Sequence, residues 1–333
     1  MSHTPHNPSR RLMLQATGAA VAAPWAFAAN AAGQIAGGKP ITLVVSYAAG
    51  GGADLMARLI APRMAEFLGQ PVLVDNKPGA GGQIAAGQVA RATPDGTQLL
   101  VDASSFAVNP SLYPKLPYDS DTAFTPLAVL AQFPNVLVCT PGFEAKSVKD
   151  LIRMAKAKPG QITYASSGNG SAQHLAGALF EDLAGVKLVH VPYRGGGPAM
   201  NDVMAGQVPL FFANVASSLG QIQSGRLRPL AVTSRRRTRS LPDMPTMEEA
   251  GVPAYEVIEW NPVMAPAGID AKSKAALVAA IRKTMADPEV LGRVRSLSGE
   301  VFPDGPEALT QAFLKAQQLK WGRIIKDRKI TAG

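Results

Sequence analysis

The chain has little of the side-chain chemistry on which disulfide-linked and metal-binding proteins depend. Its 333 residues include one cysteine, Cys139, and four histidines, of which only His174 and His190 lie beyond residue 31. A single cysteine cannot form an intramolecular disulfide. The sequence also contains no Cys, His and Asp cluster with the spacing of a metal site. We therefore expect neither a metal nor a cofactor.

The glycine-containing signatures of common hydrolases and nucleotide-binding proteins are missing as well. Neither a Gly-x-Ser-x-Gly elbow nor a Gly-x-x-x-x-Gly-Lys-Ser/Thr loop occurs. The third glycine of Gly-x-Gly-x-x-Gly is absent from the turns that start at Gly50, Gly79, Gly168 and Gly195. An exported enzyme acting on a carboxylated substrate remains an alternative, with His174 and either Asp54 or Asp202 as its acid–base pair.

After the N-terminal stretch, no uncharged apolar run of the sequence reaches the roughly 18 residues that a membrane span requires. The N-terminus itself has Arg10-Arg11 followed by an acid-free, alanine-rich stretch to about Ala32. This order is typical of a twin-arginine export signal. Residues 1–31 are therefore predicted to be a cleaved signal peptide, and the remainder a soluble periplasmic protein. A disordered tail with two chance arginines is the alternative.

Acidic residues are outnumbered by basic ones, 24 against 33, so the formal net charge is +9. It falls to +7 when Arg10 and Arg11 leave with the signal. Such a balance favours anionic partners without identifying one. The basic runs at 235–239 and 320–329 belong to no legible nucleic-acid module. We interpret them as solvated surface and expect no nucleic-acid partner.

Strand and helix patterns alternate along the chain, which is typical of a mostly parallel sheet covered by helices. About 300 residues remain after processing, more than one hydrophobic core usually spans, so two lobes are expected. The main predicted strands are 41–45, 97–102, 129–131, 136–139, 162–165, 188–191, 208–212, 227–232 and 255–265. A helix marked by Leu277 and a long one over 309–325 are expected to return to the first lobe.

Two neighbouring stretches, Ile41 to Leu68 and Pro71 to Ala92, share one pattern. Each runs from an apolar strand into a glycine-rich turn and then into an apolar-periodic helix. Bare backbone N–H groups and the positive end of the helix dipole meet at such a turn, and glycine lets a ligand approach closely. The sequence therefore predicts that an anion binds after the first strand.

Several segments, in order along nearly the whole mature chain, resemble one family. They are Gly50-Gly51-Gly52-Ala53-Asp54, Val74-Asp75-Asn76-Lys77-Pro78-Gly79-Ala80-Gly81-Gly82, Ala92-Thr93-Pro94-Asp95-Gly96, Asn109-Pro110-Ser111-Leu112-Tyr113, Leu116-Pro117-Tyr118-Asp119, Tyr164-Ala165-Ser166-Ser167-Gly168-Asn169-Gly170-Ser171, Val191-Pro192-Tyr193-Arg194-Gly195 and Ala265-Pro266-Ala267-Gly268. The chain resembles the extracytoplasmic solute receptors of tripartite tricarboxylate transporters, the Bug (TctC) family. It departs from the family at Tyr47-Ala48-Ala49, where prolines are common, and at Trp260-Asn261-Pro262.

The resemblance implies an α/β, two-lobed periplasmic binding protein of type II. Each lobe would be a mostly parallel sheet flanked by helices, with two crossover strands as the hinge. We assign 36–137 plus 259–333 to lobe I and 138–258 to lobe II. Such a receptor closes on a small carboxylated solute and delivers it to membrane permease subunits, and we expect a monomer. A ligand-sensing partner of a membrane sensor kinase would share this fold and is a further alternative.

In lobe I, the resemblance implies that the turn after the first strand holds one end of the ligand. The residues predicted to bind there are Tyr47, Ala48, Gly50, Gly51 and Asp54. The alternative role for Asp54 is to cap the following helix. The alternative role for Tyr47 and Trp260 is packing in the core. Ser104 and Ser105 follow the third strand, at the edge where open α/β sheets present their ligands.

In lobe II, the resemblance implies that the turn over 166–171 and the loop over 193–197 hold the other end. The residues predicted to bind there are Ser167, Asn169, Gly170, Ser171, His174, Arg194 and Asn214. Helix capping is the alternative role for Ser171 and Asn214. His174 can instead pack on its helix, and Arg194 can form a salt bridge at the lobe edge.

Overall fold

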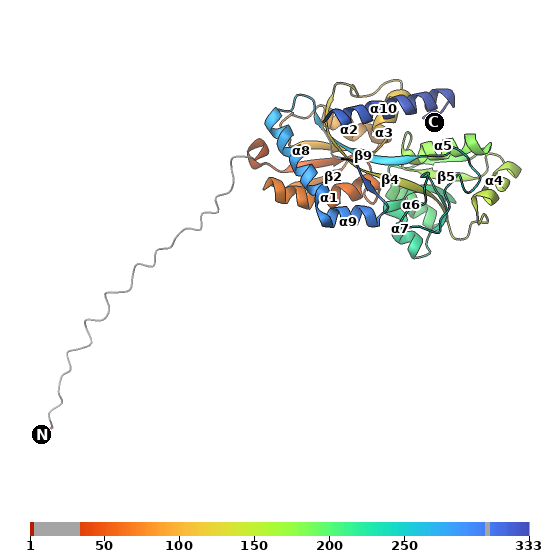
Figure 1. Ribbon diagram of the computed structural model, residues 1–333, viewed down its shortest axis with the longest axis horizontal. Helices are drawn as coiled ribbons and strands as arrows, with labels where there is room; N and C mark the ends of the chain where they lie inside the picture. Colours follow the sequence, from red (N-terminus) through yellow and green to blue (C-terminus); the bar gives the residue numbers. More distant parts are fainter. Residues whose placement is uncertain (3–33, 304–306, 333) are drawn as a thin grey trace.

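The computed structural model describes residues 1–2, 34–303 and 307–332 (Figure 1). Apart from its first two residues, the predicted export signal (residues 1–31) lies outside the described residues. Two α/β lobes stand side by side, and two strands run through the middle of the molecule from one lobe into the other. The predicted two-lobed architecture is present.

Lobe I is built on the parallel strands β1 (Ile41–Val45), β2 (Val72–Asn76) and β3 (Gln98–Val101). Its helices are α1 (Gly52–Leu68), α2 (Gln83–Ala90) and α3 (Ser105–Leu112), with short 3-10 turns at η1 (Ile35–Gly38) and η2 (Ala80–Gly82). Met56, Ile60 and Met64 recur at helical spacing along α1 and are fully buried against the sheet. The glycine turn before α1 therefore lies at the carboxyl end of β1.

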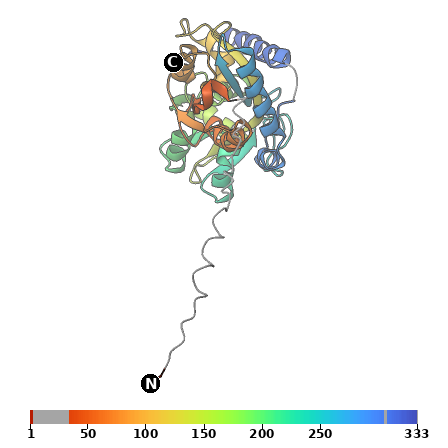
Figure 2. The same cartoon turned by 90° about the vertical axis from the view of Figure 1, so that its left-hand side faces the viewer.

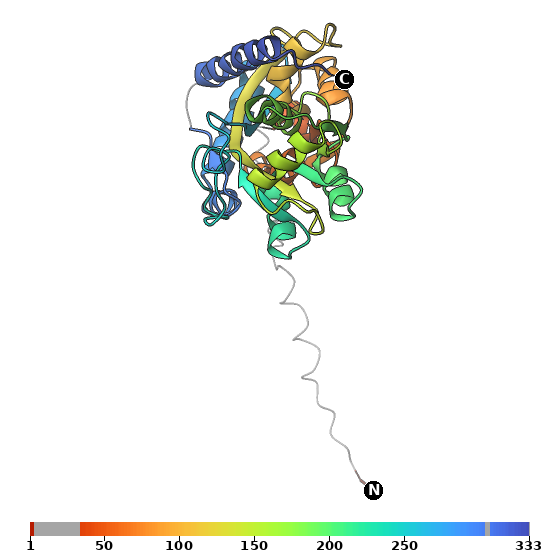
Figure 3. The ribbon, with the colours of Figure 1, turned by 90° about the vertical axis from the view of Figure 1, so that its right-hand side faces the viewer.

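Lobe II repeats this plan with β5 (Thr163–Ser166), β6 (Val189–Pro192), β7 (Leu210–Asn214) and β8 (Arg228–Val232). Its helices are α4 (Val148–Ala157), α5 (Ala172–Ala184), α6 (Gly196–Met204) and α7 (Val215–Gln223). Ser147 caps α4 by accepting a hydrogen bond from the Asp150 N–H, and its hydroxyl donates to Asp150 Oδ2. In Figure 3 these helices face the viewer.

The crossover strands are β4 (Phe124–Cys139) and β9 (Ile258–Pro266). β4 pairs antiparallel with β9 as far as Pro134, and from Asn135 onward it pairs with β7 and β8. The sequence predicted two separate segments, 129–131 and 136–139. The structure joins them, because one long strand can exchange partners as it passes between lobes. The lobe boundaries at 137/138 and 258/259 stay a prediction; β4 changes partners between Pro134 and Asn135, and β9 begins at Ile258.

The C-terminal third forms α8 (Ala271–Ala286), α9 (Pro288–Ser296), β10 (Glu300–Val301) and α10 (Glu307–Asp327). α8 packs against α1, and Figure 2 shows both in the lobe I end of the molecule. α10 lies along one edge, where Leu314 belongs to a cluster with Trp260 and Trp321 belongs to the lobe II core. Among the described helices, none is long and apolar enough to span a membrane.

The strands form one continuous sheet in the order β2-β1-β3-β9-β4-β7-β5-β6, with β8 and β10 also paired to β4. The pairs within each end of the sheet are parallel, and β4 and β9 are antiparallel to their neighbours. The turn over 48–51 after β1 and the turn over 194–197 after β6 lie against each other at the junction between the lobes.

Candidate functional site

The two lobes touch through backbone atoms in this conformation. The Ala48 N–H of lobe I donates a hydrogen bond to the Arg194 carbonyl of lobe II over 3.2 Å. A Cβ atom added to Gly197 would lie only 2.2 Å from the Ala49 carbonyl oxygen. Glycine therefore permits this closed arrangement, because any side chain at position 197 would hold the lobes apart.

A small inner cavity of about 10 Å³ lies between the lobes, enough for roughly one water-sized group. Its walls are Tyr47, Gly51, Gly52, Ala53, Ala103, Ser167, Ser171, Gln173, Gly196, Phe211, Asn214, Ser217 and Glu259. The first turns of four helices, α1, α5, α6 and α7, contribute to these walls. Helix N-termini carry partial positive charge, so four of them converging here favour a negative group.

An outer cavity of about 130 Å³ adjoins the inner one, since Tyr47 and Ser167 line both. Its remaining walls are Gly79, Ala80, Gly81, Tyr113, Gly168, Asn169, Pro192, Tyr193 and Arg194. Among the residues lining the two cavities, Arg194 is the one permanent cation, and it is exposed. The outer cavity can therefore hold a small organic acid with its charge near Arg194.

The predicted lobe I residues divide between the cavities and their support. Tyr47 and Gly51 line the inner cavity, whereas Ala48 and Gly50 lie against the lobe II glycines. Asp54 is a supporting residue: it accepts hydrogen bonds from the Gly50 N–H and from the side chains of Arg58 and Asn76. Burial acts to raise the pKa of Asp54, but these hydrogen bonds outweigh it and lower that pKa.

The two predicted serines after β3 are buried and lie outside both cavity walls. Ser105 Oγ donates to Asp102 Oδ1 over 3.3 Å, and the Ser104 hydroxyl has no hydrogen-bond partner among the described residues. Burial raises the pKa of Asp102 to about 6, although the hydroxyls of Ser46 and Ser105 and the Ala103 N–H oppose that rise. This carboxyl group lies directly behind the cavity wall at Ala103.

Most of the predicted lobe II residues meet at the cavities. Ser167 lines both, and Ser171 lines the inner one. Asn169 lines the outer one, and its Oδ1 is buried without a hydrogen-bond partner in the described part of the chain. Ser171 also caps α5 by accepting from the His174 N–H. Asn214 lines the inner cavity and caps α7 through the Ala216 and Ser217 N–H groups. Capping and cavity lining thus coexist in the same residues.

His174 lies behind this loop and lines a different cavity, together with His190. Its Nδ1 accepts a hydrogen bond from the Gly170 N–H over 3.2 Å, and its ring stacks on His190 with centroids 4.1 Å apart. Burial lowers the pKa of His174 to about 4. The structure thus gives His174 and Gly170 a role in holding the loop, on the side away from the cleft.

Sequence reasoning missed three polar side chains of the inner cavity, Gln173, Ser217 and Glu259. Gln173 Nε2 donates to Glu259 Oε2 over 2.7 Å. A signal was available, since Glu259 interrupts the apolar run of the predicted strand 255–265. Trp260 points elsewhere: its ring packs edge-to-face on Phe313 at 5.1 Å, so its role is in the core.

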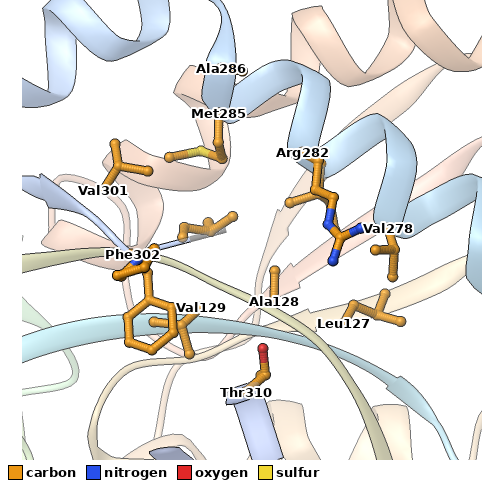
Figure 4. A pocket seen from close by; sticks show the side chains of 13 residues that line it. Leu127, Ala128, Val129, Val278, Arg282, Met285, Ala286, Val301, Phe302 and Thr310 are labelled. Atoms are coloured by element: carbon orange, nitrogen blue, oxygen red, sulfur yellow. The ribbon is translucent and has the colours of Figure 1, made fainter. Parts of the chain in front are cut away.

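A larger apolar cavity of about 220 Å³ lies in lobe I, away from the cleft (Figure 4). Leu127, Val129, Val278 and Met285 contribute aliphatic walls, and Arg282 lies among them. Arg282 already has an interaction partner. The cleft, where polar groups from both lobes converge, is therefore the better candidate for the functional site.

Two lobes that close on a small polar cavity ringed by helix N-termini define a solute-binding protein of the periplasmic type. In the part of the chain that the structure describes, no group of His, Cys, Asp or Glu is arranged to hold a metal ion.

Comparison with known proteins identifies the family. The model of the tripartite tricarboxylate transporter family receptor matches residues 56–330. The chain is 38% identical over 295 residues to the "UPF0065 protein in tcbD-tcbE intergenic region" of Pseudomonas sp. (strain P51), covering 88% of both chains. It is 34% identical over 291 residues to the protein BugT of Bordetella pertussis, covering 87% of this chain and 89% of BugT. The chain therefore belongs to the tripartite tricarboxylate transporter receptor family.

Solved structures agree in fold. The periplasmic binding protein BugD has a TM-score of 0.85 and 36% identity over 88% of this chain and 98% of BugD. Rhodopseudomonas palustris Rpa4515 with adipate has a TM-score of 0.84 and 34% identity, over 88% and 98%. MatC (Rpa3494) of the same organism with bound malate has a TM-score of 0.82 and 30% identity, over 86% and 98%. The predicted family and fold class are both confirmed.

Proposed function

We propose that this protein is an exported solute receptor that captures a small carboxylated solute between its lobes and delivers it to a membrane permease. The observation that carries the proposal is the pair of adjoining cavities that share Tyr47 and Ser167 at the lobe junction. Similar receptors with adipate and with malate support a carboxylate as the ligand.

Closure is the functional event in this proposal. Lobe closure buries the solute and brings together backbone groups such as Ala48 N–H and the Arg194 carbonyl. A permease can then distinguish the closed from the open receptor, because the two differ in the surface that both lobes present. The membrane permease, export and a monomeric state are inferred from family membership and from the predicted signal.

The hydrogen bonds of His174, Asp54 and Asp202 do not support an acid–base pair of an enzyme. His174 bonds to the Gly170 N–H, Asp54 to Arg58 and its neighbours, and Asp202 to the Tyr193 hydroxyl at 2.6 Å. Each of the three side chains thus has a structural partner of its own. We propose that the protein acts without chemical change to the solute.

A thermal-unfolding screen tests this proposal. The mature protein is refolded to remove co-purified ligand and tested against mono-, di- and tricarboxylates, amino acids and aromatic acids. A ligand at about 100 times its Kd adds roughly 2.7 kcal/mol of stability, which raises the Tm by about 5 to 10 °C. One acid giving such a shift, and recovered unchanged, supports a receptor. The absence of any shift across the panel would count against a carboxylate ligand.

A further inference from the structure

Glu259 puts a carboxyl group into the wall of the inner cavity. It comes from β9, the second crossover strand, and only 4% of its surface is exposed. Among the residues that line this cavity it is the single carboxylate, and none of them is Lys, Arg or His. A receptor for carboxylated solutes therefore carries a buried acid inside its own binding cleft.

Polar side chains lie beside the Glu259 carboxyl group. Gln173 donates to its Oε2, and a Cβ atom added to Gly52 would lie 2.9 Å from its Oε1 and 2.8 Å from Asn214 Nδ2. Burial raises the pKa of Glu259, while the side chains of Asn214 and Gln173 oppose that rise. Tyr47 is the other titratable group in the cavity wall. Glu259 itself supplies the negative charge that the four helix N-termini favour.

The sizes of the two cavities match two different chemical groups. The inner cavity has room for about one water-sized group, which suits an ammonium and is too small for a second carboxylate. The outer cavity, about 130 Å³, has room for a short carbon chain and its carboxylate, with Arg194 in its wall. The cleft thus has a negative inner end and a positive outer end.

Charge also favours an ammonium group in the inner cavity over a second carboxylate. A dicarboxylate would bring a second negative group beside Glu259 in a buried cavity whose walls carry no cation, and like charges in one site repel. An ammonium group would instead donate hydrogen bonds to Glu259 and neutralise its charge. The solute then enters as a net-neutral zwitterion, which suits a closed site.

We propose that Glu259 sets the solute class, and that the receptor binds a small monocarboxylate bearing an ammonium group, with that ammonium on Glu259 and the carboxylate in the outer cavity. This inference rests on the proposed receptor function and narrows it. Glu259 acts in it as a specificity-determining residue.

The test compares solutes that differ only in one end group. Calorimetric titration of the refolded mature protein uses four pairs: β-alanine and succinate, 4-aminobutyrate and glutarate, 5-aminovalerate and adipate, and 4-(aminomethyl)benzoate and 4-(carboxymethyl)benzoate. In at least one pair, the wild-type protein should bind the amino member at least about tenfold more tightly. Glu259→Gln, which keeps the shape and removes the charge, should weaken that binding about tenfold or more and reduce the preference to parity or reverse it.

Glu256→Gln is the matched control. Glu256 lies three residues earlier and pairs with Arg235 at 3.1 Å, outside both cavities, so this variant should keep the wild-type preference. Circular dichroism and the Tm confirm that each variant is folded. The wild-type preference also tests the proposal without any variant.

The two proposals fail differently. If the wild-type protein binds the dicarboxylates as tightly as or more tightly than their amino partners, or binds only other acids, the ammonium assignment is wrong and the receptor function stands. If Glu259→Gln leaves a wild-type preference for the amino members unchanged, Glu259 does not set the solute class. If the wild-type protein binds no acid in these pairs or in the wider screen, the carboxylate receptor itself is rejected.

Discussion

Gln173 donates a hydrogen bond to Glu259 over 2.7 Å, although 86 residues separate the two in sequence. This contact joins the first turn of α5 in lobe II to the crossover strand β9. It also gives the buried carboxyl group of Glu259 a hydrogen-bond donor. A buried carboxylate without a donor would lower the free energy of unfolding. The Gln173–Glu259 pair therefore couples the stability of the closed cleft to the charge of Glu259.

Gln173→Leu should lower the free energy of unfolding by about 1 to 3 kcal/mol at pH 8, because it removes this donor from a buried carboxylate. The raised pKa of Glu259 means that the folded protein keeps a proton which the unfolded chain releases above about pH 4.3. Stability from this group is thus greatest at low pH and is lost as pH rises through the folded pKa. The cost of Gln173→Leu should shrink toward pH 5, as denaturant titrations at both pH values would show.

The double variant Gln173→Leu/Glu259→Gln is the control for this effect. It removes the titrating carboxyl group, so the cost of losing Gln173 should become the same at pH 5 and pH 8. An equally pH-dependent cost in the double variant would mean that another group is responsible.

His174 should make the protein less stable in mild acid. Its pKa is about 4 in the folded protein and about 6.5 in an unfolded chain, so the unfolded chain takes up a proton first as pH falls. Between pH 7.5 and pH 5 this one group should remove about 2 kcal/mol from the free energy of unfolding. Chemical denaturation at the two pH values measures the loss.

His174→Gln is the comparison variant, because it removes the titration and keeps a polar side chain near the Gly170 N–H. Its pH-dependent loss should be smaller than that of the wild-type protein by about 2 kcal/mol. An identical loss in both proteins would assign the acid sensitivity to His190 or to other groups.

Gly197→Ala should impair closure without disturbing either lobe. The added methyl would meet the Ala49 carbonyl of the opposite lobe at 2.2 Å, a contact that exists only when the lobes are closed. Affinity for the acid that gives wild-type protein its largest thermal shift should fall at least about tenfold, while the unliganded Tm stays nearly constant. Titration calorimetry and thermal unfolding provide the two measurements.

Gly220→Ala serves as its control, since an added Cβ there has no atom within 4 Å. This variant should bind as the wild-type protein does. Wild-type affinity in Gly197→Ala would show that the bound state is more open than the arrangement described here.

Asp54→Asn should destabilise the turn that precedes α1. Asp54 accepts from the Gly50 N–H at 3.0 Å and from the side chains of Arg58 and Asn76. Because its pKa is lowered, its stabilisation is present above about pH 3.9 and is lost as pH falls. At pH 7 the variant should lose about 1 to 3 kcal/mol in denaturant titrations.

Asp75→Asn offers the matched comparison. Asp75 forms a salt bridge with Lys77 at 3.0 Å, and both side chains are more than 40% exposed. Exposed pairs contribute about 0 to 1 kcal/mol, so Asp75→Asn should cost clearly less than Asp54→Asn. Equal costs would argue against a supporting role for Asp54.

The residues of the cleft that could be predicted from the sequence belong to local patterns. Gly51 ends a strand-to-glycine turn, and Ser171 and Asn214 are helix caps, so each lies at a helix N-terminus next to the carboxyl end of a strand. Such positions follow from strand and helix periodicity within about ten residues. These three line the inner cavity, and their binding of the ligand stays a prediction.

Gln173 and Glu259 could not be paired in the same way, because no local pattern relates α5 to β9. The position of His174 could not be predicted either. It lies three residues after the helix cap Ser171, but the side of the loop on which it lies depends on packing against His190. The orientation of a side chain around a helix turn is set by what packs against it in three dimensions.

The sequence by itself determined the alternating strands and helices, the glycine turns at the ends of strands and the family to which the chain belongs, since each is written in residues close together along the chain. The tertiary structure alone decided how β4 exchanges partners at Asn135, how closely the lobes meet at Gly197, and that a carboxylate from Glu259 lies in the cleft. These features arise from contacts between segments far apart in sequence, where packing and charge, and no local propensity, fix the geometry.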